Sequence, residues 1–287
     1  MTKRNNVVLL FSKVPETGLV KTRLSILKDG LFPPEEAAEL YRCMLLDVVE
    51  IICAALDDLD GAANTERAAG NAFDQEDRYE LVISTTPAPN VAVMQELIDG
   101  ENFSRPITII ADEGASFDEH YNHAFTQCWE RGADCILSMG ADMPALTKAD
   151  VKFGFEQLHR LDAKEHGGIV LAPDQEMGVS VVGWTRNTDF DHSGVFYNAD
   201  GLTVLPAYIA KARDAGLPAL WLPPIPDIDT MPDFVHNVTL VHSLAYCAAF
   251  DDIHPAWRTA EKFIDLGFRE IRVAPNNLRD PREHIDT

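Results

Sequence analysis

Three cationic side chains lie within eleven residues near the start of the chain. Lys13, Lys21 and Arg23 are grouped around Gly18. Ammonium and guanidinium groups can neutralise a diphosphate or triphosphate, and an arginine can grip two oxygens at once. Residues 1–28 contain six basic residues and one acidic residue, giving +5, whereas the whole chain carries −22. This local inversion of charge favours a phosphate-binding loop over the alternative, an ordinary solvated loop.

The basic loop follows the apolar run 7–11, which reads as a buried strand. A loop at the carboxyl end of a strand, rich in N–H donors and fixed cations, is a suitable place to hold phosphate. Thr22 adds a hydroxyl group between two of the cations. The loop is not a Walker A motif, because Val20 stands where a glycine would precede the lysine.

A second candidate lies where the apolar run 135–139 ends in Gly140, two residues before Asp142. Ligands of open α/β sheets bind outside the carboxyl ends of the strands. Gly140 would let the backbone approach a ligand, and Asp142 could hold Mg²⁺ or Mn²⁺, which prefer oxygen ligands. The alternative is a carboxylate that caps local N–H groups at the entry to a helix.

Asp227 and Asp229 form a third candidate, because residues at i and i+2 of an extended segment point the same way. One or both could complete a metal shell with Asp142, and Asp229 is the preferred ligand. Capping of a turn is the alternative. Asp174 and Glu176 could face a substrate, but hairpin turn chemistry is favoured there.

Two histidines are less informative. His120 and His123 are spaced i, i+3 beside Glu119 on a predicted helix. That spacing could hold a metal, but the ordinary polarity of an exposed helix face is the favoured interpretation.

The elements around these residues alternate between short apolar runs and longer helical patterns. Continuous apolarity indicates strands buried on both faces, as in a parallel sheet. Strands are predicted at 7–11, 80–85, 107–111, 135–139, 168–172 and 179–184, with weaker ones at 219–222 and 270–274. Helices are predicted at 34–58, 91–99, 117–131, 148–162 and 200–215, and two more within 234–267. The pattern predicts an α/β fold, a three-layer αβα sandwich with a mixed, mostly parallel sheet.

Two segments depart from this alternation. Residues 57–78 are acidic and rich in Ala, Gly and Asn, which predicts an exposed loop. After Asp233 the pattern changes, so a domain over 1–233 and a helical C-terminal extension with a polar tail over 234–287 are expected. The extension would be an appended subdomain or a homo-oligomer contact.

Composition excludes several classes of protein. The apolar fraction of 46% and charged fraction of 24% are ordinary for a soluble globular protein. A strongly acidic chain argues against a nucleic-acid binder. No apolar run approaches the ~20 residues that span a bilayer. The five cysteines form no Cys-x-x-Cys pair, which favours reduced thiols and a cytoplasmic location.

The run from Lys13 to Leu24, Lys-Val-Pro-Glu-Thr-Gly-Leu-Val-Lys-Thr-Arg-Leu, is similar to the Lys-x-Pro-x-x-Gly-x-x-Lys-Thr-Arg-Leu loop of one protein family. These are the glycosyltransferase-A-fold nucleotide-diphospho-sugar transferases, in particular a small bacterial glycosyltransferase-like branch related to 2-phospholactate guanylyltransferases. Gly140–Pro144 resembles the family's Gly-Ser/Thr-Asp-x-Pro stretch, and Asp227–Thr230 its Asp-x-Asp-Thr motif. The resemblance covers about residues 5–233 in the same order.

The resemblance implies a metal-dependent transferase that binds a nucleotide or nucleotide-sugar donor and a small-molecule acceptor. Lys21 and Arg23 would hold phosphates, Asp142 would bind Mg²⁺ or Mn²⁺, and Asp229 would be a possible second ligand. Glycosyl and nucleotidyl transfer would use the same loop and metal, and the broader description of a nucleotide-sugar transferase is favoured. Nucleotidyl transfer to a phosphorylated small molecule is the alternative.

The chain departs from the family pattern at two places. The family usually has Asp-Gly-Gly-Tyr before its late core strand, where this chain has Gln-Glu-Met-Gly-Val-Ser at 175–180. Ala145 replaces an Asp that often follows the motif proline. Both changes concern the acceptor side, and they motivate a further alternative, a catalytically lapsed scaffold that binds nucleotide or a protein partner.

Overall fold

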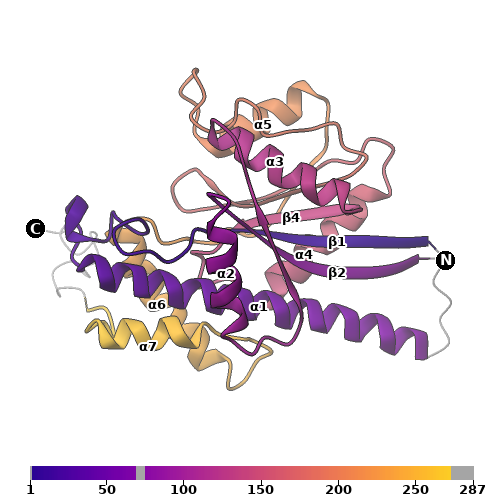
Figure 1. The fold of residues 1–287 in the computed structure, drawn as a ribbon. Helices are drawn as coiled ribbons and strands as arrows, with labels where there is room; N and C mark the ends of the chain where they lie inside the picture. The colour runs from indigo at the N-terminus through magenta and orange to yellow at the C-terminus, as the bar shows by residue number, and fades with distance from the viewer. Residues whose placement is uncertain (1, 69–74, 273–287) are drawn as a thin grey trace, which may run out of the picture.

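The computed structural model describes residues 2–68 and 75–272, and a seven-stranded sheet forms its centre (Figure 1). The strand order is β3-β2-β1-β4-β6-β5-β7. The strands are β1 (Thr2–Phe11), β2 (Gln75–Thr85), β3 (Ile107–Ala111), β4 (Cys135–Gly140), β5 (Ile169–Pro173), β6 (Val179–Thr185) and β7 (Ala219–Trp221). Only β6 runs antiparallel to its neighbours, so the sheet is mixed and mostly parallel.

The register of the central strands brings three chain positions to one edge of the sheet. Phe11, the last residue of β1, pairs with Ser84 of β2 on one side and with Gly140 of β4 on the other. The segments that follow these strands therefore start side by side. This edge is where ligands of open α/β sheets bind.

Helices cover both faces of the sheet, which makes three layers (Figure 1). The helices are α1 (Pro34–Ala68), α2 (Asn90–Asp99), α3 (Phe117–Glu130), α4 (Lys148–Asp162), α5 (Val204–Asp214), α6 (Met231–Cys247) and α7 (Trp257–Asp265), with a short 3-10 helix at Ile26–Lys28. Val8 and Leu10 pack into one core with α1, α2, α4, α6 and α7, whereas Val7 and Leu9 pack into a second core with α3 and α5. Because successive strand residues face opposite sides, a continuous apolar run is what a doubly covered strand requires.

The predicted fold class is confirmed, and most predicted elements lie close to the observed ones. The capping box at Thr147 and Asp150 begins α4 as the sequence indicates. The predicted start at 200 for α5 is too early, because Gly201 has φ 73° and the extended Thr203 precedes the first helical residue. No strand forms at 270–272, and 273–274 lie outside the described residues.

The loop predicted at 57–78 is wrong where the structure describes it. Residues 57–68 continue α1, and 75–78 belong to β2, while 69–74 lie outside the described residues. Three of the acidic side chains that suggested a loop have basic partners elsewhere in the chain. These ion pairs join Asp57 and Asp60 to Arg105, and Asp58 to Lys148 and Lys152.

The C-terminal helices share the core of the sheet. Phe234 of α6 and Phe263 of α7 are fully buried, with ring centroids 5.1 Å apart. The Phe234 ring also contacts Phe32 at 5.0 Å, so residues from both ends of the chain meet there. The domain division at 233 and a homo-oligomer contact stay predictions.

Four of the five free cysteines are buried, as expected for core thiols, and Cys247 is exposed. Over residues 2–68 and 75–272, no helix is both long enough and apolar enough to cross a membrane.

We expect Phe263→Ala to lower the free energy of unfolding by about 3–5 kcal/mol, the usual cost of emptying a buried phenylalanine site. Urea denaturation measures this change. Ile264→Ala on the same helix is the matched control, because Ile264 is exposed and its loss leaves no comparable cavity. Equal stability of the two variants would show that α7 does not contribute to the core.

Candidate functional site

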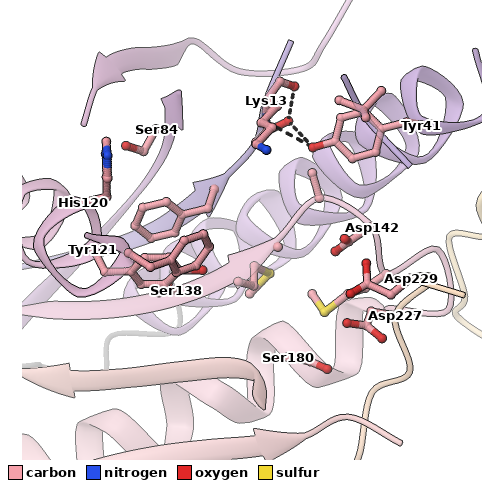
Figure 2. Close-up of a pocket in the computed structure, with 18 of the residues that line it drawn as sticks. Lys13, Tyr41, Ser84, His120, Tyr121, Ser138, Asp142, Ser180, Asp227 and Asp229 are labelled. Carbon is pink, nitrogen blue, oxygen red and sulfur yellow. Dashed lines mark hydrogen bonds between the residues drawn. The ribbon is translucent and has the colours of Figure 1, made fainter. Parts of the chain in front are cut away.

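A pocket of about 670 Å³ opens at the carboxyl ends of β1, β2 and β4 and beside the start of the antiparallel β6 (Figure 2). Its wall is built from the basic loop after β1, the segment after β4, and the extended segment before α6. The acidic and basic residues that line it are Lys13, Lys21, Arg23, Lys28, Asp112, His120, Asp142, Asp227 and Asp229.

The Lys21 ammonium joins the basic loop to both acidic segments. Its Nζ donates to Asp142 Oδ2 at 2.6 Å and to Asp229 Oδ1 at 3.0 Å, and its side chain is 5% exposed. Burial alone would lower the pKa of Lys21, but the two carboxylates more than offset it and raise the pKa above its usual value. Lys21 therefore stays charged. The structure thus brings Lys21 into contact with Asp142, 121 positions away in the sequence, and with Asp229, 208 positions away.

Tyr41 of α1 fixes the start of the basic loop. Its hydroxyl lies 2.9 Å from Ser12 Oγ and accepts from the Lys13 backbone N–H at 3.2 Å (Figure 2). Its ring lies beside Lys21, with Nζ 5.8 Å from the ring centre. Burial, together with the nearby Asp142 charge, raises the pKa of Tyr41 to about 12. The residue is therefore a neutral clamp on the loop.

The rest of the basic loop is tightly turned. Gly18 has φ 78° and Lys21 has φ 46°, a left-handed conformation that residues with a Cβ seldom adopt. Arg23 is 62% exposed, and its Nη1 lies 3.4 Å from Asp229 Oδ2, so this ion pair is weak. Thr22, between Lys21 and Arg23 in the sequence, also lines the pocket.

The two acidic segments are joined through the backbone. The Ile228 N–H donates to the Asp142 carbonyl at 3.0 Å. Asp233, in the capping box of α6, accepts from the Asp229 N–H at 3.2 Å. A Cβ at Gly140 would lie 2.7 Å from Asp142 Oδ1, so only glycine leaves the carboxylate undisturbed. These contacts hold Asp142 and Asp229 at fixed positions.

Asp227 is the third carboxylate of this wall (Figure 2). Burial raises its pKa to about 7, and the charges of Asp142 and Asp229 act in the same direction. Gln175 Nε2 donates to Asp227 Oδ1 at 3.0 Å. Asp174 accepts from two backbone N–H groups of its own hairpin, so it acts in the turn, which agrees with the favoured interpretation.

Asp142 and Asp229 could supply part of the coordination shell of a divalent cation. Asp142 and Asp229 already share one cation, the Lys21 ammonium, and carboxylate oxygens suit Mg²⁺ and Mn²⁺. Among the described residues no group of three or more His, Cys, Asp or Glu is arranged to hold a metal. Mg²⁺ usually takes one or two carboxylates and completes its shell with water and substrate phosphates. Two carboxylates are therefore enough if a phosphate ligand is present and Lys21 moves aside.

Sequence reasoning missed a second polar cluster in the pocket. Asp112 is 4% exposed, accepts from Ser84 Oγ at 2.7 Å, and lies 2.5 Å from His120 Nδ1. His120 therefore faces the pocket rather than an open helix surface. His123 instead accepts from the Glu113 backbone N–H at 2.8 Å. The rule that ligands bind at the carboxyl ends of the strands could have found this cluster, because Ser84 lies at the end of β2 and Asp112 directly follows β3.

Aromatic rings surround this second cluster. Phe11 and Tyr121 stack with centroids 3.8 Å apart, and Phe117 packs against Tyr121 at 5.3 Å and Phe196 at 5.0 Å. All four line the pocket, so it has an aromatic end and an ionic end.

Comparison with solved structures identifies the fold. The "putative nucleotide-diphospho-sugar transferase" of Desulfovibrio desulfuricans G20 is 21% identical, with a TM-score of 0.65, over 91% of this chain and 95% of that one. The chain has a nucleotide-diphospho-sugar transferase-like fold. This agrees with the resemblance found in the sequence, and an identity this low shows the fold alone.

More distant structures and one family model also match. CMP:2-keto-3-deoxy-manno-octonic acid synthetase complexed with CTP is 12% identical over 84% of this chain and 99% of that one, with a TM-score of 0.45. A cytidylyltransferase from Leptospira borgpetersenii is 11% identical over 94% and 99%, with a TM-score of 0.43. Residues 70–199 match the family described as "Uncharacterized protein conserved in bacteria (DUF2064)". No curated protein matches the sequence.

We expect Tyr41→Phe to lower the free energy of unfolding by about 1–3 kcal/mol, because Ser12 Oγ and the Lys13 N–H lose a buried partner. Chemical denaturation measures the change. Tyr246→Phe is the matched control, since Tyr246 is 72% exposed and such surface changes stay within about 0.5 kcal/mol. A Tyr41→Phe protein as stable as the control would exclude the clamp.

Proposed function

We propose that the pocket binds a nucleotide sugar through its phosphates, together with Mg²⁺ or Mn²⁺, and that the protein transfers the glycosyl group to a small-molecule acceptor. The observation that carries this proposal is the Lys21 ammonium held between Asp142 and Asp229 at the edge of the sheet where phosphate ligands bind. A fold shared with a protein named as a nucleotide-diphospho-sugar transferase supports it.

The charge balance of the ionic end supports a metal-bound phosphate rather than a bare one. Asp142 and Asp229 bring two negative charges to the single ammonium of Lys21, and Asp227 lies close by. A diphosphate alone would meet this negative wall and be repelled. A diphosphate that carries a divalent cation presents positive charge to the carboxylates and negative oxygens to the basic loop.

Each residue then has a distinct task. Asp142 and Asp229 would hold the metal, which when bound supplies charge neutralisation at the phosphates. Lys21, released from the carboxylates, would donate to the phosphate oxygens, with Arg23 and Lys13 adding charge from the exposed side of the loop. Thr22 would offer a hydroxyl donor, and Gly140 leaves room for the ligand. Gly18 is not among the residues that line the pocket, so its part would be to turn the loop, with φ 78°.

The size of the pocket suits a small-molecule ligand. Its volume of about 670 Å³ lies within the range of ~300–1,000 Å³ typical of small-molecule sites. Ser180 and Asp227 extend the wall beyond the phosphate position, toward β6. A glycosyl group attached to the second phosphate would lie in that part of the pocket. When this group is transferred to the acceptor, the nucleoside diphosphate is the leaving group.

We expect Asp142→Asn to abolish the stabilisation that a nucleoside diphosphate with Mn²⁺ gives the wild-type protein. At a ligand concentration of 100 times Kd that stabilisation is about 2.7 kcal/mol. Thermal unfolding measures this stabilisation with each of GDP, UDP, CDP and ADP, once in the presence of Mn²⁺ and once in the presence of a chelator. Undiminished binding of nucleotide by the variant, or in chelator, would contradict the metal role of Asp142.

Lys21→Ala and Arg23→Ala should each weaken nucleotide binding by about 10- to 100-fold, the value of one charge-assisted hydrogen bond. Isothermal titration at fixed ionic strength measures both, and circular dichroism confirms that the variants fold. Lys164→Ala, an exposed lysine away from the pocket, is the control. If both loop variants bind as the control does, the loop is not the phosphate site.

A further inference from the structure

We propose that His120, oriented by Asp112, makes the pocket select nucleobases that present a ring N–H, guanine and uracil, over cytosine and adenine. This rests on the proposed function, since it concerns the base of the same nucleotide.

The hydrogen bonds around Asp112 set the tautomer of His120. An ionised carboxylate only accepts hydrogen bonds. Asp112 Oδ2 accepts from Ser84, and Oδ1 lies 2.5 Å from His120 Nδ1, so Nδ1 carries the proton. In a neutral imidazole the other nitrogen, Nε2, is then an acceptor. His120 lines the pocket, and the ring is held by a buried partner rather than free to turn.

Because the pocket has an ionic end and an aromatic end, the base of the nucleotide would lie beside His120. Figure 2 shows His120 and Ser84 at one end, and Asp142, Asp227 and Asp229 at the other. Phosphates belong at the ionic end. A planar heterocycle stacks favourably on aromatic rings, which Phe117 offers at the opposite end, where its side chain is 47% exposed.

The spacing of the strands suits a ligand that reaches both ends. Ser84 and Gly140 lie on either side of Phe11, two strand spacings or about 10 Å apart. A nucleoside diphosphate can bridge a separation of this size between its base edge and its phosphates.

An acceptor at this position distinguishes the four bases by one atom. Guanine N1 and uracil N3 carry hydrogen and can donate to His120 Nε2. Cytosine N3 and adenine N1 carry lone pairs, so that two acceptors would face each other without a proton between them. A ligand that leaves a polar group of the site unpaired is rejected, here by about 10- to 100-fold.

The test compares the Kd values of GDP, UDP, CDP and ADP by isothermal titration with Mn²⁺. GDP and UDP should bind at least about 10-fold more tightly than CDP and ADP. Each class contains one purine and one pyrimidine, so base size cannot produce this pattern.

Two variants assign the preference to the histidine. His120→Phe keeps a flat ring without the acceptor, and it should bring the four Kd values together while phosphate binding remains. Asp112→Asn frees the imidazole from its fixed tautomer and should reduce or reverse the preference. His166→Phe, an exposed histidine remote from the pocket, should keep the wild-type order.

The outcomes separate this inference from the proposed function. Four equal Kd values in the wild-type protein, or a preference that survives both His120→Phe and Asp112→Asn, would overturn the base selection and leave the nucleotide site standing. If none of the four nucleotides binds, the proposed function fails and the selection fails with it.

Discussion

One buried ammonium holds the candidate site together. Lys21 Nζ contacts carboxylates from two other parts of the chain, so the loop after β1, the segment after β4 and the segment before α6 meet at a single charge. Burying an ion is costly unless its partners are close and well aligned. Two carboxylate oxygens within 3.0 Å meet that condition. Without Lys21, Asp142 and Asp229 would lose the ammonium that they share, and Asp229 would keep only its weak, exposed ion pair with Arg23.

The surrounding structure is arranged to keep this contact. Lys21 adopts a left-handed backbone, and a non-glycine residue does so only where its surroundings fix it. Tyr41 holds the loop from the helix side, and Gly140 leaves space for the Asp142 carboxylate. The result is a site whose charged side chains are in place before any ligand arrives, so that no further ordering is needed to bring the basic loop and the two acidic segments together.

Much of this could be predicted from the sequence, because the decisive signals are local. Continuous apolar runs predicted the buried strands, and a glycine and an aspartate at a strand end predicted the position of Asp142. The basic loop was visible as a charge inversion. The meeting of Lys21 and Asp142 follows from strand order, since β1 and β4 are neighbours in the sheet.

What the sequence did not reveal depends on partners far along the chain. The end of α1 was predicted as a loop because its composition is acidic and rich in Ala, Gly and Asn, yet Arg105, 48 positions from Asp57, pairs with that carboxylate. His120 looked like a surface residue because nothing local showed that Asp112 is buried and bonded to Ser84, 28 positions earlier. Local composition cannot distinguish a solvated charge from one with a distant partner.

The backbone bond between Ile228 and Asp142 has a mechanical consequence. It makes the acidic side of the pocket a single rigid unit, anchored at once to the central strand β4 and to the start of α6. The basic side is held as well, because Val20 is buried in the core and Lys21 Nζ contacts both acidic segments. A ligand that draws the Lys21 ammonium away from the carboxylates therefore exchanges one set of ionic contacts for another while both walls of the pocket stay in place.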